Sequence, residues 1–255
     1  MQRFRTTVCP LLILGAMAAA LPAPGGTILN TLQAANDGGP GWSGALDGLY
    51  SGSGGNTERI IFSAGGRVQW RGDADRVRLQ VSGGYEESAG QVTARNMVAH
   101  LRHNHDLDAD WATILFVQVQ ANPFQRLKSR WLTGAGLRRD LVDDEAGLVA
   151  LGATPMLEVE RVEGETGHTA RGRLSMFLHV ARRLSDSAKL DLVGFWQPLF
   201  SDFSDARSVG NLALKVDVTG SVDLKVGLAV EDDARPPAGV KRTDWGTFAG
   251  FGVEF

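Results

Sequence analysis

Apolar and polar residues alternate along most of this chain. The pattern is clearest in its last third, where Leu212, Leu214 and Val216 take every second position. Side chains of an extended strand point to opposite faces in turn, so the pattern predicts strands with one apolar and one polar face. Such segments are expected near 42–52, 58–70, 76–86, 92–105, 111–121, 127–140, 147–160, 169–183, 188–199, 206–218, 222–231 and 243–255.

The links between these segments alternate in length. Short polar links recur at every second connection, whereas other links, such as 160–169 and 231–242, are longer. Antiparallel strands joined in sequence order place every second link at the same end of the sheet, so the pattern predicts an up-and-down barrel with one end of short turns. The short links are 105–110, 139–144, 183–187 and 218–221.

The direction of the apolar face decides which kind of barrel this is. A soluble, lipocalin-like barrel has the same period with its apolar residues inside, and it is the alternative fold. Three features favour a membrane barrel. Twelve strands enclose more space than apolar side chains would fill, the polar face carries full charges, and the sequence ends on an apolar strand. The predicted fold is therefore an all-β, transmembrane, antiparallel barrel of about twelve strands.

The last strand also carries a targeting pattern. A terminal aromatic residue on an apolar strand resembles the assembly signal of bacterial outer-membrane barrels. The residues expected to form this signal are Trp245, Phe251, Val253 and Phe255.

Alternation assigns a lipid-facing and a lumen-facing set of side chains. The lipid-facing set is Leu212, Leu214, Val216, Val222, Leu224, Val226 and Leu228. The lumen candidates are Arg67, Arg78, Arg130, Glu158, Arg173, Lys189, Asp191, Lys215, Asp217, Lys225, Glu231 and Glu254. Because both signs are interleaved, these charges either pair across the lumen and occlude it, or line a narrow channel with weak ion preference.

The first residues have the pattern of a signal peptide. Arg3 and Arg5 precede an apolar stretch that ends in alanines, so cleavage is expected after Ala20. Removing residues 1–20 takes away two arginines and no acidic residue, which changes the net charge from −3 to −5, and it also removes Cys9. Residues 21–41 are expected to form a periplasmic leader, compatible with one short helix, and 42–255 the barrel.

Histidines are the residues best suited to catalysis or metal binding here. On a strand, His103 and His105 share a face and His100 takes the other, so the three do not converge as metal ligands must. His179 and Ser175 are two positions apart on the polar face, with no nucleophile elbow nearby. We therefore expect no metal site, no cofactor and no catalytic residue. An outer-membrane hydrolase is the least favoured hypothesis for the function.

Three stretches resemble a known family. The segment 48–57, Gly-Leu-Tyr-Ser-Gly-Ser-Gly-Gly-Asn-Thr, resembles the "SGNT" strand–turn signature of the salt-induced outer-membrane proteins, with one extra glycine. The segment 233–244 resembles that family's closing hairpin, and 196–205 resembles the link between its ninth and tenth strands. The resemblance covers 42–255 and implies an outer-membrane barrel. It implies no catalytic residues.

These observations predict an outer-membrane β-barrel protein of undefined molecular activity. A link to salt or osmotic stress rests on the resemblance alone, and the alternative function is a narrow pore for ions or small solutes. Both termini are expected in the periplasm. The expected partners are outer-membrane lipid and the barrel-assembly machinery, with small solutes if the lumen is open. The acidic balance argues against a nucleic-acid partner.

Overall fold

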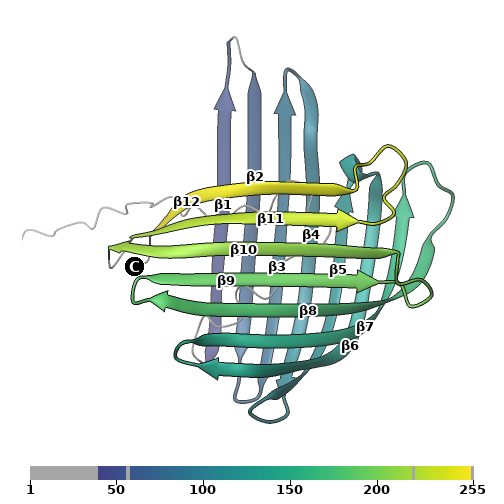
Figure 1. Cartoon of the computed structure of the whole chain (residues 1–255). Helices are drawn as coiled ribbons and strands as arrows, with labels where there is room; N and C mark the ends of the chain where they lie inside the picture. Colours follow the sequence, from purple (N-terminus) through teal and green to yellow (C-terminus); the bar gives the residue numbers. More distant parts are fainter. Residues whose placement is uncertain (1–39, 56–57, 220–221, 254–255) are drawn as a thin grey trace, which may run out of the picture.

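The computed structural model describes residues 40–55, 58–219 and 222–253. Its strands form one antiparallel sheet in sequence order (Figure 1). They are β1 (Gly41–Ser53), β2 (Arg59–Arg71), β3 (Asp75–Ser88), β4 (Gln91–Asp106), β5 (Trp111–Asn122), β6 (Leu127–Asp144), β7 (Gly147–Val162), β8 (Thr169–Ser185), β9 (Ala188–Pro198), β10 (Ala206–Thr219), β11 (Val222–Asp233) and β12 (Thr243–Val253). The signal peptide and most of the predicted leader lie outside the described residues.

All twelve predicted strands are present, and the prediction of an antiparallel, up-and-down, all-β fold is confirmed. The largest boundary difference is at β6, which continues to Asp144 instead of ending near Asp140. Within the described residues the one helical element is a 3-10 turn, Pro123–Gln125, whose amides are capped by the Asn122 side chain. No helix in this part of the chain is long and apolar enough to cross a membrane.

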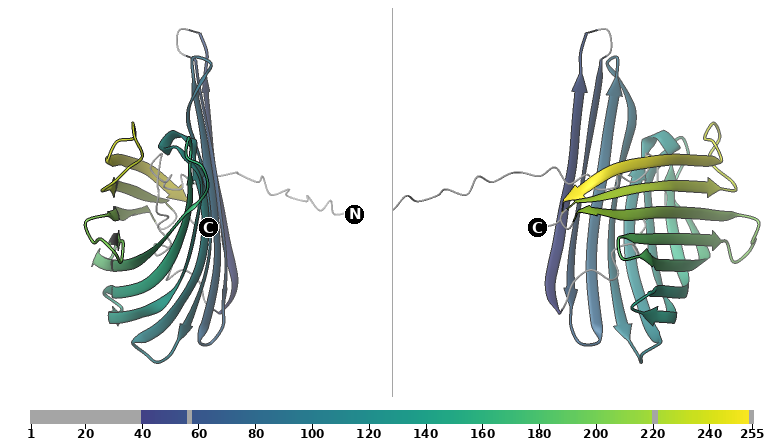
Figure 2. Two further views of the ribbon diagram at one scale, coloured as in Figure 1. Left: turned by 90° about the vertical axis from the view of Figure 1, so that its right-hand side faces the viewer. Right: turned by 60° about the vertical axis from the view of Figure 1, so that its left-hand side comes forward.

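Closure of the sheet differs from the prediction. Pairing runs without interruption from β1–β2 to β11–β12, but no pairing joins β12 to β1 among the described residues. The sheet curls strongly, and β12 lies across the direction of β1 rather than along it (Figures 1 and 2). Closing a barrel requires matched tilt at the two edges, so in this arrangement the edge strands are not aligned to exchange hydrogen bonds.

The two ends of the sheet differ as the link lengths predicted, except at two links. We call the end that holds links 145–146 and 186–187 the short-turn end, and the opposite end, with links 163–168, 199–205 and 234–242, the long-loop end. At the long-loop end, the β5–β6 link 123–126 is only as long as the β4–β5 link 107–110 of the short-turn end, and the β3–β4 hairpin turns on two residues only. Ala89 and Gly90 both adopt positive φ, at 49° and 73°, which matches the right-handed twist of the flanking strands.

The concave face of the sheet has an apolar part that alternation did not predict. Ile114, Phe177 and Val193 are buried there, and Phe116 and Phe195 pack against them. We call these five side chains the apolar layer. They come from β5, β8 and β9, so the layer joins strands that are not neighbours in the sheet. The interior is therefore not lined by charged residues alone. The curl brings facing walls close enough for rings to pack.

Candidate functional site

The inner face of the curled sheet holds most of the buried polar side chains. Along β10 the alternation of outward and inward side chains is clear, because Leu212 is 40% exposed whereas its neighbour Ala213 is 5% exposed. Leu228 is also exposed, and Leu214, Val216, Leu224 and Val226 are half-buried. The Val222 side chain lies outside the described part.

At the long-loop end, three arginines and four carboxylates form one buried cluster. Arg130, Glu158 and Arg173 are each 0% exposed. The Arg130 Nε donates to Glu158 Oε2 at 2.8 Å, and the Arg173 Nε donates to Glu158 Oε1 at 3.2 Å. Glu158 therefore compensates charges from both of its neighbouring strands, β6 and β8.

Arg207 extends this cluster across the interior. From β10 it donates to Glu158 and Glu160 of β7, the latter at 3.0 Å, and to Asp233 of β11 at 2.9 Å. Arg173 also reaches Asp205, in the β9–β10 link, at 2.9 Å. We call this set the ion-pair cluster. Its members are Arg130, Glu158, Glu160, Arg173, Asp205, Arg207 and Asp233.

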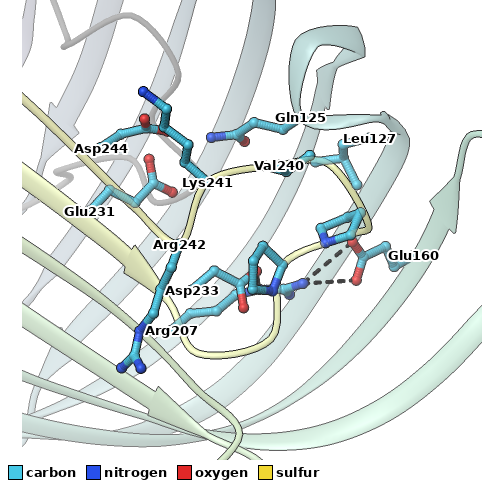
Figure 3. A pocket seen from close by; sticks show the side chains of 12 residues that line it. Gln125, Leu127, Glu160, Arg207, Glu231, Asp233, Val240, Lys241, Arg242 and Asp244 are labelled. Atoms are coloured by element: carbon cyan, nitrogen blue, oxygen red, sulfur yellow. Dashed lines mark hydrogen bonds and ion pairs between the residues drawn. The ribbon is translucent and has the colours of Figure 1, made fainter.

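A small cavity lies beside the ion-pair cluster, under the β11–β12 link. Its volume is about 30 Å³, the scale of a single water molecule. Figure 3 shows Arg207 and Glu160 bonded on one side, with Glu231 and Lys241 on the other. The Arg126 side chain ties the β5–β6 link to this loop through the Ala238 carbonyl oxygen, at 2.9 Å. This part of the interior is filled by side chains and loop.

Nearer the middle of the strands, the apolar layer rests on glycines. A Cβ at Gly152 would meet the Phe177 ring at 2.0 Å, and one at Gly134 would meet the Phe116 ring at 2.8 Å. The Arg102 guanidinium of β4 lies 5.6 Å from the centroid of the Phe177 ring of β8. The layer thus brings opposite walls of the curled sheet into contact.

The other wall, on β2 to β4, is basic. Register places Arg71 opposite Arg76, Arg78 opposite Arg102, and Arg67 in the same cross-strand row as Gln80 and His100. We call these three rows, which contain five arginines and His100, the arginine rows. Followed across β1 to β6, all of them described, the three rows hold no acidic residue. The residues of these rows are Gly41, Arg71, Arg76, Asn104, Ile114 and Gly136; Ser43, Gln69, Arg78, Arg102, Phe116 and Gly134; and Ala45, Arg67, Gln80, His100, Gln118 and Leu132.

Neutral amides orient the arginine rows. The Arg78 Nε donates to Gln69 Oε1, and the Arg102 Nε donates to Asn104 Oδ1, each at 2.9 Å. His100 Nδ1 lies 2.9 Å from Gln118 Oε1, and its ring stacks on Phe116. Buried atoms on the same strands have no hydrogen-bond partner within the described protein. They are Ser63 Oγ, Arg76 Nε, Gln80 Oε1 and His100 Nε2.

The histidine predictions can be checked against this geometry. As expected, His103 and His105 share a face, and both bond to Asp75 Oδ1, at 2.8 and 2.9 Å. His179 bonds to Asp191 Oδ2 at 3.0 Å. The hydroxyl of Ser175 instead accepts a hydrogen bond from the Gln197 amide at 3.0 Å. Among the described residues, no group of histidine, cysteine and acidic side chains is arranged to hold a metal ion.

Other predicted lumen residues lie near the short-turn end. Register aligns Arg183, Lys189, Lys215 and Lys225 in one row across β8 to β11. An acidic pair, Asp217 opposite Asp223, follows at the strand ends. The side chain of Lys225, Glu254 and most of the predicted assembly signal lie outside the description. Of that signal, Trp245 is exposed on the outer face.

The sequence prediction missed part of the ion-pair cluster. It named Arg130, Glu158 and Arg173. It did not name Glu160, Arg207 and Asp233, although alternation also places these three on the inner face, near strand ends. Asp205 lies in a link, where alternation carries no information. Arg76, at the start of the third predicted segment, and Arg102, within the fourth, were also missed, although they lie on the same face as Arg78.

The family comparison matches the model described as "Protein of unknown function, DUF481" over residues 50–255. The chain belongs to the DUF481 family. The match spans β2 to β12 in full. No curated protein matches the sequence of this DUF481 protein.

Solved structures resemble this DUF481 chain in fold. The structure titled "NanC porin structure in rhombohedral crystal form" has 10% sequence identity and a TM-score of 0.50, and the match covers 83% of this chain and 99% of that one. The translocator domain of the autotransporter NalP from Neisseria meningitidis has 11% identity and a TM-score of 0.43, over 86% of this chain and 90% of that one. The likeness to the first of these structures shows a porin-like β-barrel fold.

Proposed function

We propose that this protein is a narrow pore for small solutes in the bacterial outer membrane. The observation that supports the proposal best is the polar wall on the inner face of β2 to β4, which the long-loop half of β5 continues. It runs from Asn122 near the long-loop end, through Gln120, Gln118 and Arg102, to Asn104 near the short-turn end. Such a wall gives a solute polar partners along the whole length of the strands.

The opposite half of the interior narrows this route. The ion-pair cluster fills the space between β7 and β10 at the long-loop end, and the apolar layer fills the middle. A solute would pass between these filled regions and the polar wall, beside the contact of Arg102 with Phe177. Only small solutes fit such a route. The likeness in fold to a solved porin is consistent with this proposal and does not name a solute.

The proposal includes the surroundings of the protein. Exposed apolar side chains on the outer face, such as Leu79, Leu115 and Leu212, suit contact with lipid. We infer an outer-membrane location with both termini in the periplasm, and insertion by the barrel-assembly machinery. The link to salt or osmotic stress stays a prediction from the family resemblance. No enzymatic role is proposed.

A closed, structural barrel is the second candidate. The ion-pair cluster favours it, because cross-lumen charge pairs occlude the interior that they span. In this case the protein would stiffen the envelope without conducting. Conductance separates the two candidates.

The test is single-channel recording of the refolded protein in a planar bilayer. We expect steady conductance steps for the wild type and larger steps for Phe177→Ala, because the variant removes a ring from the apolar layer. Phe124→Ala is the matched control, since Phe124 lies exposed in the β5–β6 link. A silent bilayer with well-folded protein would reject the pore and favour the closed barrel.

A further inference from the structure

The outer face of the sheet carries a hollow that the proposed pore does not use. Its volume is about 970 Å³, and its lining residues come from β5 to β9. Leu137, Leu151 and Leu178 line it and are 46%, 43% and 38% exposed. Ala153 and Gly194 also line it, and nothing lies within 4 Å of the Cβ position of Gly194. Large apolar side chains thus surround small ones on the face that we assign to lipid.

One end of this hollow is charged. Of the described residues that line it, Arg139 alone carries a full charge. The Arg139 guanidinium lies 5.2 Å from the centroid of the Trp111 ring, and no carboxylate within residues 40–55, 58–219 and 222–253 forms an ion pair with it. Its neighbour Arg138 points inward and pairs with Asp140 at 2.6 Å. The chain therefore supplies an acid to the inner arginine and none to the outer one.

The register shows how the hollow runs. Trp111 is the first residue of β5 and lies opposite Arg139, so the charged end is at the short-turn end. From Arg139 one cross-strand row continues through Leu151 and Leu178 to Gly194. The four spacings from β5 to β9 cover about 19 Å. Half of the hydrocarbon core of a bilayer is about 15 Å thick. The hollow therefore has the length of one extended acyl chain.

We propose that this hollow binds one acyl chain of an anionic phospholipid, whose phosphate pairs with Arg139. The inference rests on the proposed outer-membrane location and not on pore activity. A guanidinium binds phosphate through paired N–H donors, and tryptophan rings favour the depth of the lipid headgroups. With the short-turn end in the periplasm, the phosphate lies in the periplasmic leaflet, which is the phospholipid side of an outer membrane.

A second copy of this chain would fit the hollow less well. In a two-fold symmetric pair the same surface meets itself, so apolar walls would cover the Arg139 guanidinium without bringing a carboxylate to it. A charge that is buried without a partner is costly. A phospholipid with a net negative charge supplies both the apolar chain and the missing counter-charge.

The test is native mass spectrometry of the folded protein, released from micelles that contain phosphatidylglycerol or phosphatidylcholine with the same acyl chains. We expect the wild type to retain phosphatidylglycerol several-fold more than phosphatidylcholine, and Arg139→Gln to lose most of this preference. Arg182→Gln is the matched control. Arg182 is exposed at the short-turn end of β8, on the same face as Leu178, but it does not line the hollow. Gel migration before and after boiling verifies that each variant is folded.

A second pair of variants tests the acyl chain. Gly194 and its cross-strand neighbour Gly210 both have nothing within 4 Å of their Cβ positions, so both have room there for a side chain. Gly194 lines the hollow, whereas Gly210 does not. We expect Gly194→Leu to reduce the retention of both lipids, and Gly210→Leu to retain them as the wild type does.

Each contrary outcome has a distinct meaning. Equal retention of the two lipids by the wild type, or the same preference in Arg139→Gln, overturns the inference. Retention that Gly194→Leu leaves unchanged assigns the lipid to the general surface and also overturns it. A dimer that Gly194→Leu dissociates would assign the hollow to a second copy instead. A silent bilayer rejects the pore alone, whereas folded protein that stays soluble without detergent overturns both the proposed location and this site.

Discussion

Glu158 is the residue on which the long-loop end of the interior depends. It accepts hydrogen bonds from Arg130, Arg173 and Arg207, which come from three different strands. All four side chains are almost fully buried. When one partner of a buried ion pair is removed, the remaining charge stays desolvated and uncompensated. The stability of this region is therefore sensitive to one carboxylate.

We predict that Glu158→Gln destabilises the folded barrel by roughly 3–5 kcal/mol, the usual cost of breaking a buried pair. The measurement is the urea concentration at which the gel migration of the folded form is lost. Glu165→Gln is the control, because Glu165 is exposed in the β7–β8 link. Equal midpoints for the two variants would show that the cluster contributes little.

Gly152 is the second position where one residue sets the packing. Its Cα supports the Phe177 ring, and an added Cβ would lie 2.0 Å from the ring edge. We expect Gly152→Ala to cost about 1–3 kcal/mol, as overpacking usually does. Gly194→Ala is the control, since nothing lies within 4 Å of its Cβ position. The double variant Gly152→Ala/Phe177→Leu replaces the ring by a smaller side chain. If it did not recover stability, the clash would not be the cause.

At the scale of single elements, each strand serves two environments. In β10, Leu212 points outward and Asn211 points inward, and both lie at the middle of the strand. The two residues are adjacent, so the same substitution at each position compares lipid and lumen directly. Alternation made this division predictable, because the direction of a side chain in a strand depends only on its position.

Leu212→Arg is expected to destabilise the protein by about 2–4 kcal/mol in a bilayer, the range for arginine on the lipid face near the midplane. Asn211→Arg should be far milder, because its new charge faces the interior. The folded fraction after refolding into liposomes reports the difference. A larger loss for Asn211→Arg would reverse the assignment of the faces.

The links at the long-loop end are joined by an exposed ion pair. The Arg235 Nη2 of the β11–β12 link donates to Asp202 Oδ2 of the β9–β10 link at 2.6 Å. The hydroxyl of Ser204 donates to the same carboxylate and, with its own amide and Arg235, lowers the pKa of Asp202. A lowered pKa means that the contact stabilises the links above the unfolded pKa of about 3.9 and is lost as the pH falls through the folded value.

We therefore predict that the link contact is intact at neutral pH and opens in acid below about pH 4. The amide chemical shift of Ser204, which donates to Asp202, follows this transition by NMR. In Asp202→Asn the shift should resemble the acid form at every pH. A titration unchanged by this variant would assign the transition to another group.

At the scale of the whole molecule, the two edge strands decide whether the sheet is a barrel. β1 and β12 carry backbone groups that pair with β2 and β11 on one side only. In hydrocarbon, unpaired amides and carbonyls cost several kcal/mol each. Membrane insertion should therefore favour pairing of these edges, which is not formed among the described residues.

We expect hydrogen exchange in liposomes to show protection of all amides of β12 within Thr243–Val253. In the curled, open sheet, every second amide of this strand would point away from β11 and exchange quickly. The amides of β7 are the internal reference, because this strand is paired on both sides. Alternating protection in β12 would mean that the open edge persists in the membrane.

The sequence by itself determined the twelve strands, their order and the two faces of each, because side-chain direction in a strand is a local property with period two. It identified Arg130, Glu158 and Arg173 as inward residues for the same reason. Its segments 48–57 and 233–244 also resembled a family whose β-barrel fold the structure shares.

Only the tertiary structure decided which inward residues meet. Arg207 and Glu160 are 47 positions apart, and the curl of the sheet brings them into contact. The same curl packs Phe177 against Arg102 and separates a compensated cluster from the arginine rows. These contacts depend on curvature and stagger summed over many strand pairs, and no local pattern in the chain records that sum.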